Sequence, residues 1–281
     1  MLTASFIVGK GMTEDLERAL WARGILDWDL AREHAVEVGE ILGTQRANKL
    51  LETLALARTA RDKGDAAWFH AHWPKEHLWR MWRGWCEPVQ CGLLDIETTG
   101  LTAGFDQVTV IGLVCAEGKA AYVAGAPQDG HEPLDRFPER LRQLRLLGTF
   151  NGINFDLPFL EKHFRGINLK FDLPHIDWMY PARQAGLNGG LKDMEKQLGI
   201  GREADIKDVR GNIAVQLWAQ WKQQGDLAAY RRLTTYCIAD CANLRPFADA
   251  VYDRLWAKAY GQHARQVDFA AIKGQQQSIF G

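Results

Sequence analysis

The stretch GLLDIETTGL, residues 92–101, decides how this sequence folds. It is apolar at its start and ends in Thr-Thr-Gly, which is typical of a buried strand that stops at a glycine turn. Asp95 and Glu97 lie two residues apart in this strand, so their side chains point to the same face. Two acids on one face of a buried strand are unfavourable unless a partner neutralises them. A divalent cation is such a partner, because it compensates for desolvation and for the repulsion between the carboxylates.

The segments after this strand predict a sheet covered by helices. Residues 107–116 and 119–126 continue as strands two and three of an antiparallel meander. A helix is expected over 133–144, and a fourth apolar strand over 146–151. Strands then give way to helices, the last of them over 226–260. A meander followed by alternating strands and helices predicts an α/β fold with a mixed sheet.

The rest of the chain divides around this α/β domain, which spans residues 87–260. Residues 1–86 are predicted to form an N-terminal helical region, with helices over 29–42 and 44–63 among others. Residues 261–281 are polar and are expected to form a flexible tail.

Composition excludes several classes of protein. The 281 residues are 47% hydrophobic and carry a formal net charge of −1, so binding to a polyanion needs local basic patches or bound metal. The five cysteines are an odd number without a CxxC pair, which indicates reduced thiols in the cytosol. No signal peptide and no run of about 20 apolar residues occurs. We therefore expect a cytoplasmic protein without a membrane segment, associated with the nucleoid.

Three further residues extend the acidic pair. Asp156 follows the fourth strand in FNGINFDLPFL, at the start of the next helix, and Tyr236 and Asp240 lie four residues apart on one helix face. Strand end, helix start and helix side can converge at the carboxyl ends of the strands. Four carboxylates without clustered His or Cys favour Mg²⁺ or Mn²⁺. Such a cluster suits two-metal hydrolysis of phosphodiesters.

The three motifs resemble, in order, the exonuclease motifs of the DEDD superfamily. DIETTGL is similar to the first, FNGINFDLPFL to the second as found in proofreading domains of family B DNA polymerases, and Tyr236 with Asp240 to the third in its YxxxD form. The chain most resembles the YprB-like ribonuclease-H-fold exonucleases of the tyrosine subtype, and this similarity extends to residues 175–183 and to parts of the N-terminal region. The resemblance implies a ribonuclease-H-like fold with a mixed five-stranded sheet, an N-terminal helical domain and 3′–5′ exonuclease activity.

The resemblance also implies a role for each site residue. Asp95 would bridge two Mg²⁺ (or Mn²⁺) ions, Glu97 and Asp240 would complete the site of the first, and Asp156 would hold the second. Tyr236 would orient the attacking water. Contacts to the substrate strand are expected from Thr98, Asn151 and Phe155, although Asn151 could instead fix the loop after the fourth strand.

Several of these residues also have purely structural interpretations. Asp95 and Glu97 could lie on a solvated strand edge, Asp156 could cap a helix and Tyr236 could be a core aromatic. Asp177 is interpreted as a cap for the next helix and His175 as structural. Positive charge that could flank a cleft is concentrated between the second and third motifs, at Lys162, Arg165, Lys170, Arg183, Lys192, Lys196, Arg202 and Lys207.

Two N-terminal segments leave alternatives open. Residues 73–85 interleave tryptophans with basic residues, which fits a platform for single-stranded nucleic acid. The same tryptophans fit a helical stripe that packs onto the nuclease domain, which we favour. Residues 7–20 partly resemble the hairpin of a helix-hairpin-helix, whose glycines let backbone amides approach phosphate. A structural turn explains them equally well.

The last residues suggest a protein partner. The string from Gln276 to Phe280 resembles the pentapeptide with which bacterial replication and repair proteins bind the sliding clamp. An exposed Ile-Phe pair on a polar tail is unfavourable unless a partner covers it. Clamp binding would raise the local concentration at DNA ends. The candidate contact residues are Gln276, Ser278, Ile279 and Phe280.

Together these observations predict a 3′–5′ exonuclease that acts on single-stranded or frayed DNA ends in repair or replication. The alternatives are an RNA-trimming exonuclease of the same fold and an adaptor that binds DNA or the clamp through a vestigial site. One sequence does not separate DNA from RNA, because the difference depends on contacts to the 2′-hydroxyl.

Overall fold

A computed structural model describes residues 2–202 and 211–261 of the chain. These residues form two compact units. The N-terminal unit comprises residues 2–87, 172–174 and 251–261, and the second comprises the remainder up to residue 250. Lys207 and the four predicted clamp contacts lie outside the described residues.

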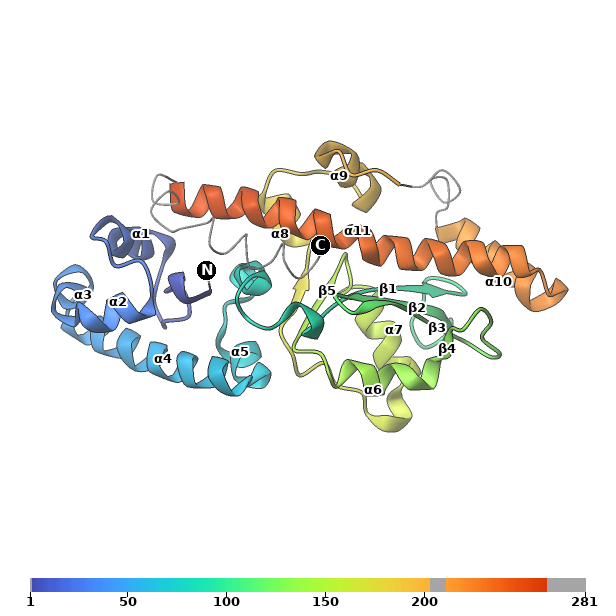
Figure 1. Cartoon of the computed structure of the whole chain (residues 1–281), viewed down its shortest axis with the longest axis horizontal. Coiled ribbons are helices and arrows are strands. Elements are labelled where there is room, and N and C mark those ends of the chain that lie inside the picture. The colour runs from blue at the N-terminus through green and yellow to red at the C-terminus, as the bar shows by residue number, and fades with distance from the viewer. Residues whose placement is uncertain (1, 203–210, 262–281) are drawn as a thin grey trace. The chain divides into compact units, whose positions relative to one another are not determined.

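The N-terminal unit is helical, as the sequence predicts (Figure 1). The expected helix over 29–42 is interrupted, because His34 leaves helical geometry with φ −103° and ψ 37°. None of the described helices is long and apolar enough to cross a membrane. The helices of this unit are α1 (Glu14–Ala22), α2 (Trp28–Glu33), α3 (Ala35–Leu42), α4 (Thr44–Lys63) and α5 (Ala66–His72), with short 3-10 helices η1 (Leu2–Ala4) and η2 (Lys75–Trp82).

The tryptophans of residues 73–85 are core residues of the N-terminal unit. Trp73, Trp79 and Trp85 are each 3% exposed and Trp82 is 8% exposed, so their ring faces are not available for stacking on bases. Trp79 packs edge-on against Tyr252, with 5.6 Å between ring centroids. The segment forms 3-10 turns and not a helical stripe. Its burial supports packing over the nucleic-acid platform, but the ring contacts lie within the N-terminal unit and not on the nuclease domain as expected.

The second unit contains a mixed sheet, which confirms the predicted fold class. The strand order is β4-β3-β2-β1-β5-β6, so the sheet has six strands where five were expected. The strands missing from the prediction are very short, and too few residues alternate in them to produce a pattern. The strands are β1 (Cys91–Thr98), β2 (Val108–Cys115), β3 (Gly118–Val123), β4 (Glu132–Pro133), β5 (Leu146–Thr149) and β6 (His175–Asp177).

Strand direction puts the carboxyl ends of three strands at one edge. β1 pairs antiparallel with β2 and parallel with β5, and β5 pairs parallel with β6. β1, β5 and β6 therefore all end at the same edge, where the loops after them can share a site. The register of β1 shifts between Glu97 and Thr98, which is a bulge at its end.

Helices cover both faces of the sheet (Figure 1). In Figure 1, α10 and α11 run along one side of the strands, and α6 and α7 lie on the other. The helix expected over 133–144 is shorter, a 3-10 turn (Leu134–Arg136) followed by α6. The helices are α6 (Phe137–Leu141), α7 (Asp156–His163), α8 (Met179–Gln184), α9 (Leu191–Leu198), α10 (Gly211–Gln224) and α11 (Leu227–Tyr260).

Gly112 allows α11 to lie close to the sheet. It sits in β2 directly opposite Asp95 of β1. A Cβ atom at Gly112 would lie 2.9 Å from Sγ of Cys237 and 2.8 Å from Sγ of Cys241, closer than real Cβ atoms approach. Glycine therefore sets the distance between α11 and β2. The same helix carries Tyr236 and Asp240, which this close packing brings toward Asp95.

Candidate functional site

All eight predicted catalytic and substrate-binding residues line one cavity of about 190 Å³ in the second unit. The structure thus brings together side chains that are as far apart in the chain as residues 95 and 240. The cavity is lined by Asp95, Ile96, Glu97, Thr98, Gly100, Leu101, Phe150, Asn151, Phe155, Asp156, Val215, Tyr236 and Asp240.

The end of β1 contributes two acids to this cavity. Glu97 is 7% exposed. Potential ligand atoms of Asp95, Glu97 and Cys237 lie within 4.8 Å of one another, close enough for one metal ion. The thiol of Cys237 instead donates a hydrogen bond to the backbone carbonyl of Asp95 at 3.5 Å. Burial raises the pKa of this thiol well above its ordinary value, so it stays protonated and is a poor ligand.

Asp156 contributes a third acid from the first turn of α7. Its side chain is 3% exposed, and its Oδ1 accepts no hydrogen bond within the described part of the chain. A buried carboxylate oxygen without a donor is costly, so an unfilled partner such as a cation is indicated here. The structural interpretation of Asp156 as a simple helix cap does not explain this oxygen.

The loop between β5 and α7 is held by Asp177 at the end of β6. Its carboxylate accepts hydrogen bonds from the backbone amides of Asn151 at 2.7 Å, Ile153 at 3.1 Å and Met179 at 3.2 Å. The predicted contact with the next helix is therefore present, since Met179 begins α8. The two contacts with the Asn151 loop were not predicted. They fix a loop in which Asn151 has the uncommon φ of +64°.

His175 is structural in the way the sequence suggested. Its Nε2 lies 2.8 Å from Oγ1 of Thr149 in a buried hydrogen bond. His175 belongs to β6 and Thr149 to β5, so the contact joins neighbouring strands next to the cavity.

Tyr236 and Asp240 enter the cavity from α11. They are 7% exposed each, and they share one face of the helix as their spacing predicts. Burial, followed by the charges of Asp240 and Asp95, raises the pKa of Tyr236. The phenol therefore keeps its proton at neutral pH. Nζ of Lys192 lies 4.8 Å from the centroid of the Tyr236 ring, a cation–π contact.

The electrostatics of the cavity favour a bound cation. Burial, followed by the charge of Asp240, raises the pKa of both Asp95 and Glu97 well above the values of free carboxyl groups. Burial also raises the pKa of Asp156 to about 7. These acids therefore resist ionisation together unless positive charge enters the cavity. Oxygen donors that are buried, close together and mutually repelling fit Mg²⁺ or Mn²⁺.

The three predicted substrate contacts have different surroundings. Thr98 donates its hydroxyl to the backbone carbonyl of Gly100 and so holds the turn after β1. The ring of Phe155 packs on Phe159 with 4.8 Å between centroids. Oδ1 of Asn151 accepts from the side-chain amide of Asn154 at 2.9 Å. All three line the cavity, with the hydroxyl of Thr98 already engaged.

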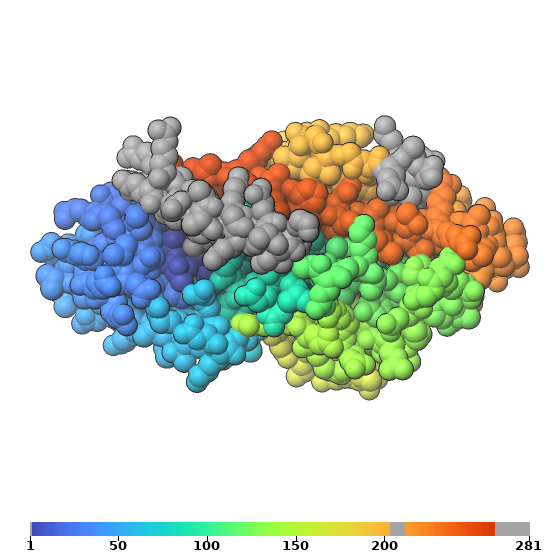
Figure 2. All heavy atoms as spheres, viewed as in Figure 1, coloured from blue at the N-terminus to red at the C-terminus, as the bar shows by residue number. Residues whose placement is uncertain are grey.

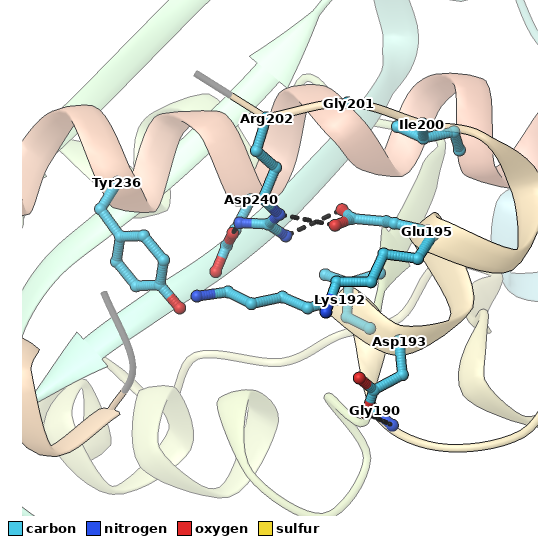
Figure 3. A pocket seen from close by; sticks show the side chains of 11 residues that line it. Gly190, Lys192, Asp193, Glu195, Ile200, Gly201, Arg202, Tyr236 and Asp240 are labelled. Carbon is cyan, nitrogen blue, oxygen red and sulfur yellow. Dashed lines mark hydrogen bonds and ion pairs between the residues drawn. The ribbon is translucent and has the colours of Figure 1, made fainter. Parts of the chain in front are cut away.

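A second cavity of about 770 Å³ adjoins the first, and Tyr236 and Asp240 line both. Figure 3 shows the guanidinium of Arg202 between the carboxylates of Asp240 and Glu195, with the amine of Lys192 extended toward Tyr236. In Figure 2 the segment of α9 stands next to α11 at the surface, which agrees with the contact of Lys192 with Tyr236. The sequence indicated that some basic residues would flank the cleft without saying which.

Glu195 is a functional-site neighbour that the sequence analysis missed. It is 1% exposed although it is an acid. A signal was present, because Leu191, Met194, Glu195 and Leu198 follow the spacing of the apolar stripe of a helix, with an acid at one of its positions.

Comparison with known families supports the assignment of the fold. The family model of the RNase H superfamily matches residues 93–252, more than half of the chain and the whole of the candidate site. The chain belongs to the RNase H superfamily. This membership supports a nuclease-type function for the second unit, and nucleases of this fold generally use divalent metals.

This chain is also similar to a solved structure, the family B DNA polymerase of the hyperthermophilic archaeon Pyrobaculum calidifontis. The similarity covers 60% of this chain and 25% of the polymerase chain, with 14% identity and a TM-score of 0.47. The matched part of this chain spans only about a quarter of the length of that polymerase. No curated protein matches this chain.

Proposed function

We propose that this member of the RNase H superfamily is a metal-dependent 3′–5′ exonuclease that degrades single-stranded or frayed DNA ends. The observation that carries the proposal is the convergence of Asp95, Glu97, Asp156 and Asp240 with Tyr236 in one cavity. Three separate elements, β1, α7 and α11, supply these residues. A purely structural role for these acids has no evident advantage, because burial and the nearby charge of Asp240 raise the pKa of Asp95 and of Glu97.

In the proposed mechanism the four carboxylates hold two divalent ions, Mg²⁺ or Mn²⁺. When bound, such ions lower the pKa of a water molecule and stabilise charge on the attacking and leaving oxygens. Asp95 would contact both ions, Glu97 and Asp240 the first and Asp156 the second. The protein's contribution is to fix these oxygens before the substrate arrives.

Tyr236 is proposed to orient the attacking water through its hydroxyl group. Its raised pKa means that it acts as a neutral phenol, by hydrogen bonding, and not as a phenolate base. Thr98, Asn151 and Phe155 are proposed to contact the terminal nucleotides. Phe155 offers an aromatic ring for stacking, which tolerates any base.

DNA as the substrate, and the sliding clamp as a partner, are proposed on the sequence of the tail. The string from Gln276 to Phe280 lies outside the described residues, so its support is the resemblance to clamp-binding pentapeptides. Deleting residues after Gly274 is expected to remove clamp binding and to leave cleavage of short oligonucleotides unchanged. Unchanged clamp binding after this deletion would exclude the tail as the contact.

The experiment that tests the function uses labelled oligonucleotides of DNA and of RNA in parallel. Each is incubated with purified protein in Mg²⁺, in Mn²⁺ and in EDTA. We expect degradation of single-stranded DNA in either metal and none in EDTA. Preference for RNA would favour a trimming ribonuclease, and degradation of neither polymer would exclude the enzyme. Asp129→Asn is the matched control for variants of the cavity acids such as Asp95→Asn and Asp240→Asn, because Asp129 is an acid of the same unit that does not line the cavity.

A further inference from the structure

The guanidinium of Arg202 forms ion pairs with two carboxylates, those of Glu195 and of the candidate metal ligand Asp240. Its Nε lies 2.5 Å from Oε2 of Glu195 and its Nη2 lies 2.8 Å from Oε1 of the same residue. The remaining terminal nitrogen, Nη1, donates to Oδ1 of Asp240. All three side chains are nearly buried: when side-chain atoms alone are counted, 6% of Arg202, 1% of Glu195 and 10% of Asp240 is exposed.

We propose that Arg202 is a positioning residue that, anchored by Glu195, holds Asp240 in the orientation required for metal binding. This inference rests on the proposed function, because it assigns Asp240 to a metal site. The inference concerns Arg202 and Glu195, which support the ligand Asp240, and it assigns neither of them a contact with the substrate.

The geometry of the guanidinium favours this role. Arginine presents its donors in a rigid planar fork, and a bidentate contact with one carboxylate fixes the plane of the whole group. Because Glu195 occupies two of the nitrogens, the direction of Nη1 is fixed as well. The contact with Asp240 uses Oδ1 only, so Arg202 does not occupy Oδ2.

The backbone that carries Arg202 is itself tied to both helices. Helix α9 ends at Gly199, which has φ +73°, and the amide of Ile200 donates back to the carbonyl of Glu195 at 2.9 Å. The chain therefore turns back toward its own helix. From α11, the side-chain amide of Asn243 donates to the carbonyl of Gly201 at 3.3 Å. Arg202 thus starts from a backbone position fixed relative to Asp240.

The charge balance explains why a pair is used and not a single arginine. An unpaired arginine would reduce the negative charge available to cations. Glu195 cancels the charge of Arg202, so the pair can orient Asp240 without changing the net charge around the four carboxylates. Partners behind metal ligands commonly act in this way, and losing one lowers metal affinity or activity about 10- to 100-fold.

The test must separate positioning from stability, because removing Arg202 alone leaves Glu195 buried and unpaired. The double variant Arg202→Met/Glu195→Gln removes both charges at similar volume, and such replacements of buried pairs are often neutral for stability. Arg202→Lys is the second variant, since lysine keeps the charge but loses the fork. The matched control is Arg231→Met/Asp129→Asn, which removes a bidentate pair of the same unit that lines neither cavity.

Three quantities are measured for each protein: the thermal midpoint in EDTA, Mn²⁺ affinity by calorimetry without nucleic acid, and kcat and KM on single-stranded DNA. We expect the double variant to unfold within a few degrees of the wild type. Its Mn²⁺ affinity should fall about tenfold or more and its kcat about 10- to 100-fold, with a smaller change in KM. The Mn²⁺ affinity and kcat of Arg202→Lys should lie between those of the wild type and those of the double variant. The control pair should match the wild type in all three quantities.

Mn²⁺ affinity equal to that of the wild type in both Arg202 variants would overturn the positioning role, whatever the activity. A fall in Mn²⁺ affinity in a protein that cleaves neither DNA nor RNA would instead support the positioning role and exclude the proposed function. The two failures are therefore distinguishable.

Discussion

The carboxylate of Asp177 accepts a hydrogen bond of 2.7 Å from the backbone amide of Asn151. The two residues follow neighbouring parallel strands, β6 and β5, and the contact fixes the loop that leads to Asp156. Asp177, which does not line the cavity, thus fixes the loop that precedes the proposed metal ligand Asp156. Its sequence position suggested a helix cap, and the structure adds this second role.

Asp177→Ala is expected to lower the free energy of unfolding by about 1–3 kcal/mol, because buried backbone amides lose their acceptor. It should also lower kcat, because the loop that positions Asp156 loses two of its hydrogen bonds. Urea denaturation and single-stranded DNA cleavage measure the two effects. Asp226→Ala is the control: Asp226 caps α11 through the amide of Ala228 at 2.9 Å, and its loss costs about 0.5–2 kcal/mol. Full activity of the Asp177 variant under conditions where both proteins are folded would contradict the prediction.

Asp95→Asn is expected to abolish cleavage while making the metal-free protein more stable. Removing a residue that only supports a metal ligand costs up to roughly 100-fold in activity. Asp95→Asn should cost more, because it removes a proposed ligand itself. Stability should rise because a neutral amide avoids both the burial of a charge and the repulsion between carboxylates, the two effects that raise the pKa of Asp95. Thermal unfolding in EDTA and a cleavage assay test both parts. A variant that is less stable and still active would show that the acid is structural.

Stability in EDTA is expected to fall as the pH rises from about 4 to about 7. The pKa of Asp156 is raised to about 7 in the folded protein, above the 3.8 of an ordinary aspartate. Between these values the folded state holds more protons than the unfolded state, so stability is lost with increasing pH. Saturating Mg²⁺ should oppose this loss, because cations bind the ionised carboxylates. The measurement is the thermal midpoint at pH 5, 6, 7 and 8 with and without Mg²⁺. A stabilisation by Mg²⁺ that does not grow with pH would refute this prediction.

Tyr236→Phe is expected to reduce kcat about 10- to 100-fold and to leave the shape of the pH–rate profile unchanged. The hydroxyl orients water in our proposal, and its raised pKa keeps it protonated throughout the neutral range. Removing it should therefore delete no titrating group from the profile. Loss of the alkaline limb in the phenylalanine variant would indicate that Tyr236 ionises during the reaction. Mn²⁺ affinity should stay close to that of the wild type, because no ligand has been changed.

Residues that form local patterns were predictable from the sequence. The apolar run and the glycine turn in 92–101 predicted β1, and the four-residue spacing of Tyr236 and Asp240 predicted one face of α11. Their convergence could be expected because strand ends and helix starts meet at one edge of an α/β sheet. The short strands β4 and β6 give too few residues for a period to appear, so the sequence pattern indicated only four of the six strands, and the expected number of five came from the family resemblance.

Contacts between distant side chains were not predictable in the same way. Arg202 follows a glycine turn and belongs to no periodic pattern, so nothing in its neighbourhood indicates that it reaches Asp240. The acid at position 195 on an apolar stripe signals a buried partner but does not identify it. The approach of α11 to β2 depends on the missing side chain of Gly112, which acts only once both elements are packed.

The central claim is that the carboxylates around Asp95 and Asp240 remove nucleotides from a 3′ end with the help of divalent metal. The most direct measurement follows 5′-labelled single-stranded DNA in Mg²⁺ at single-nucleotide resolution, with wild type and Asp240→Asn compared at equal concentration. We expect a ladder that shortens by one nucleotide at a time from the 3′ end with the wild type, and intact DNA with the variant. Equal degradation by both proteins, or internal cuts without a ladder, would contradict it.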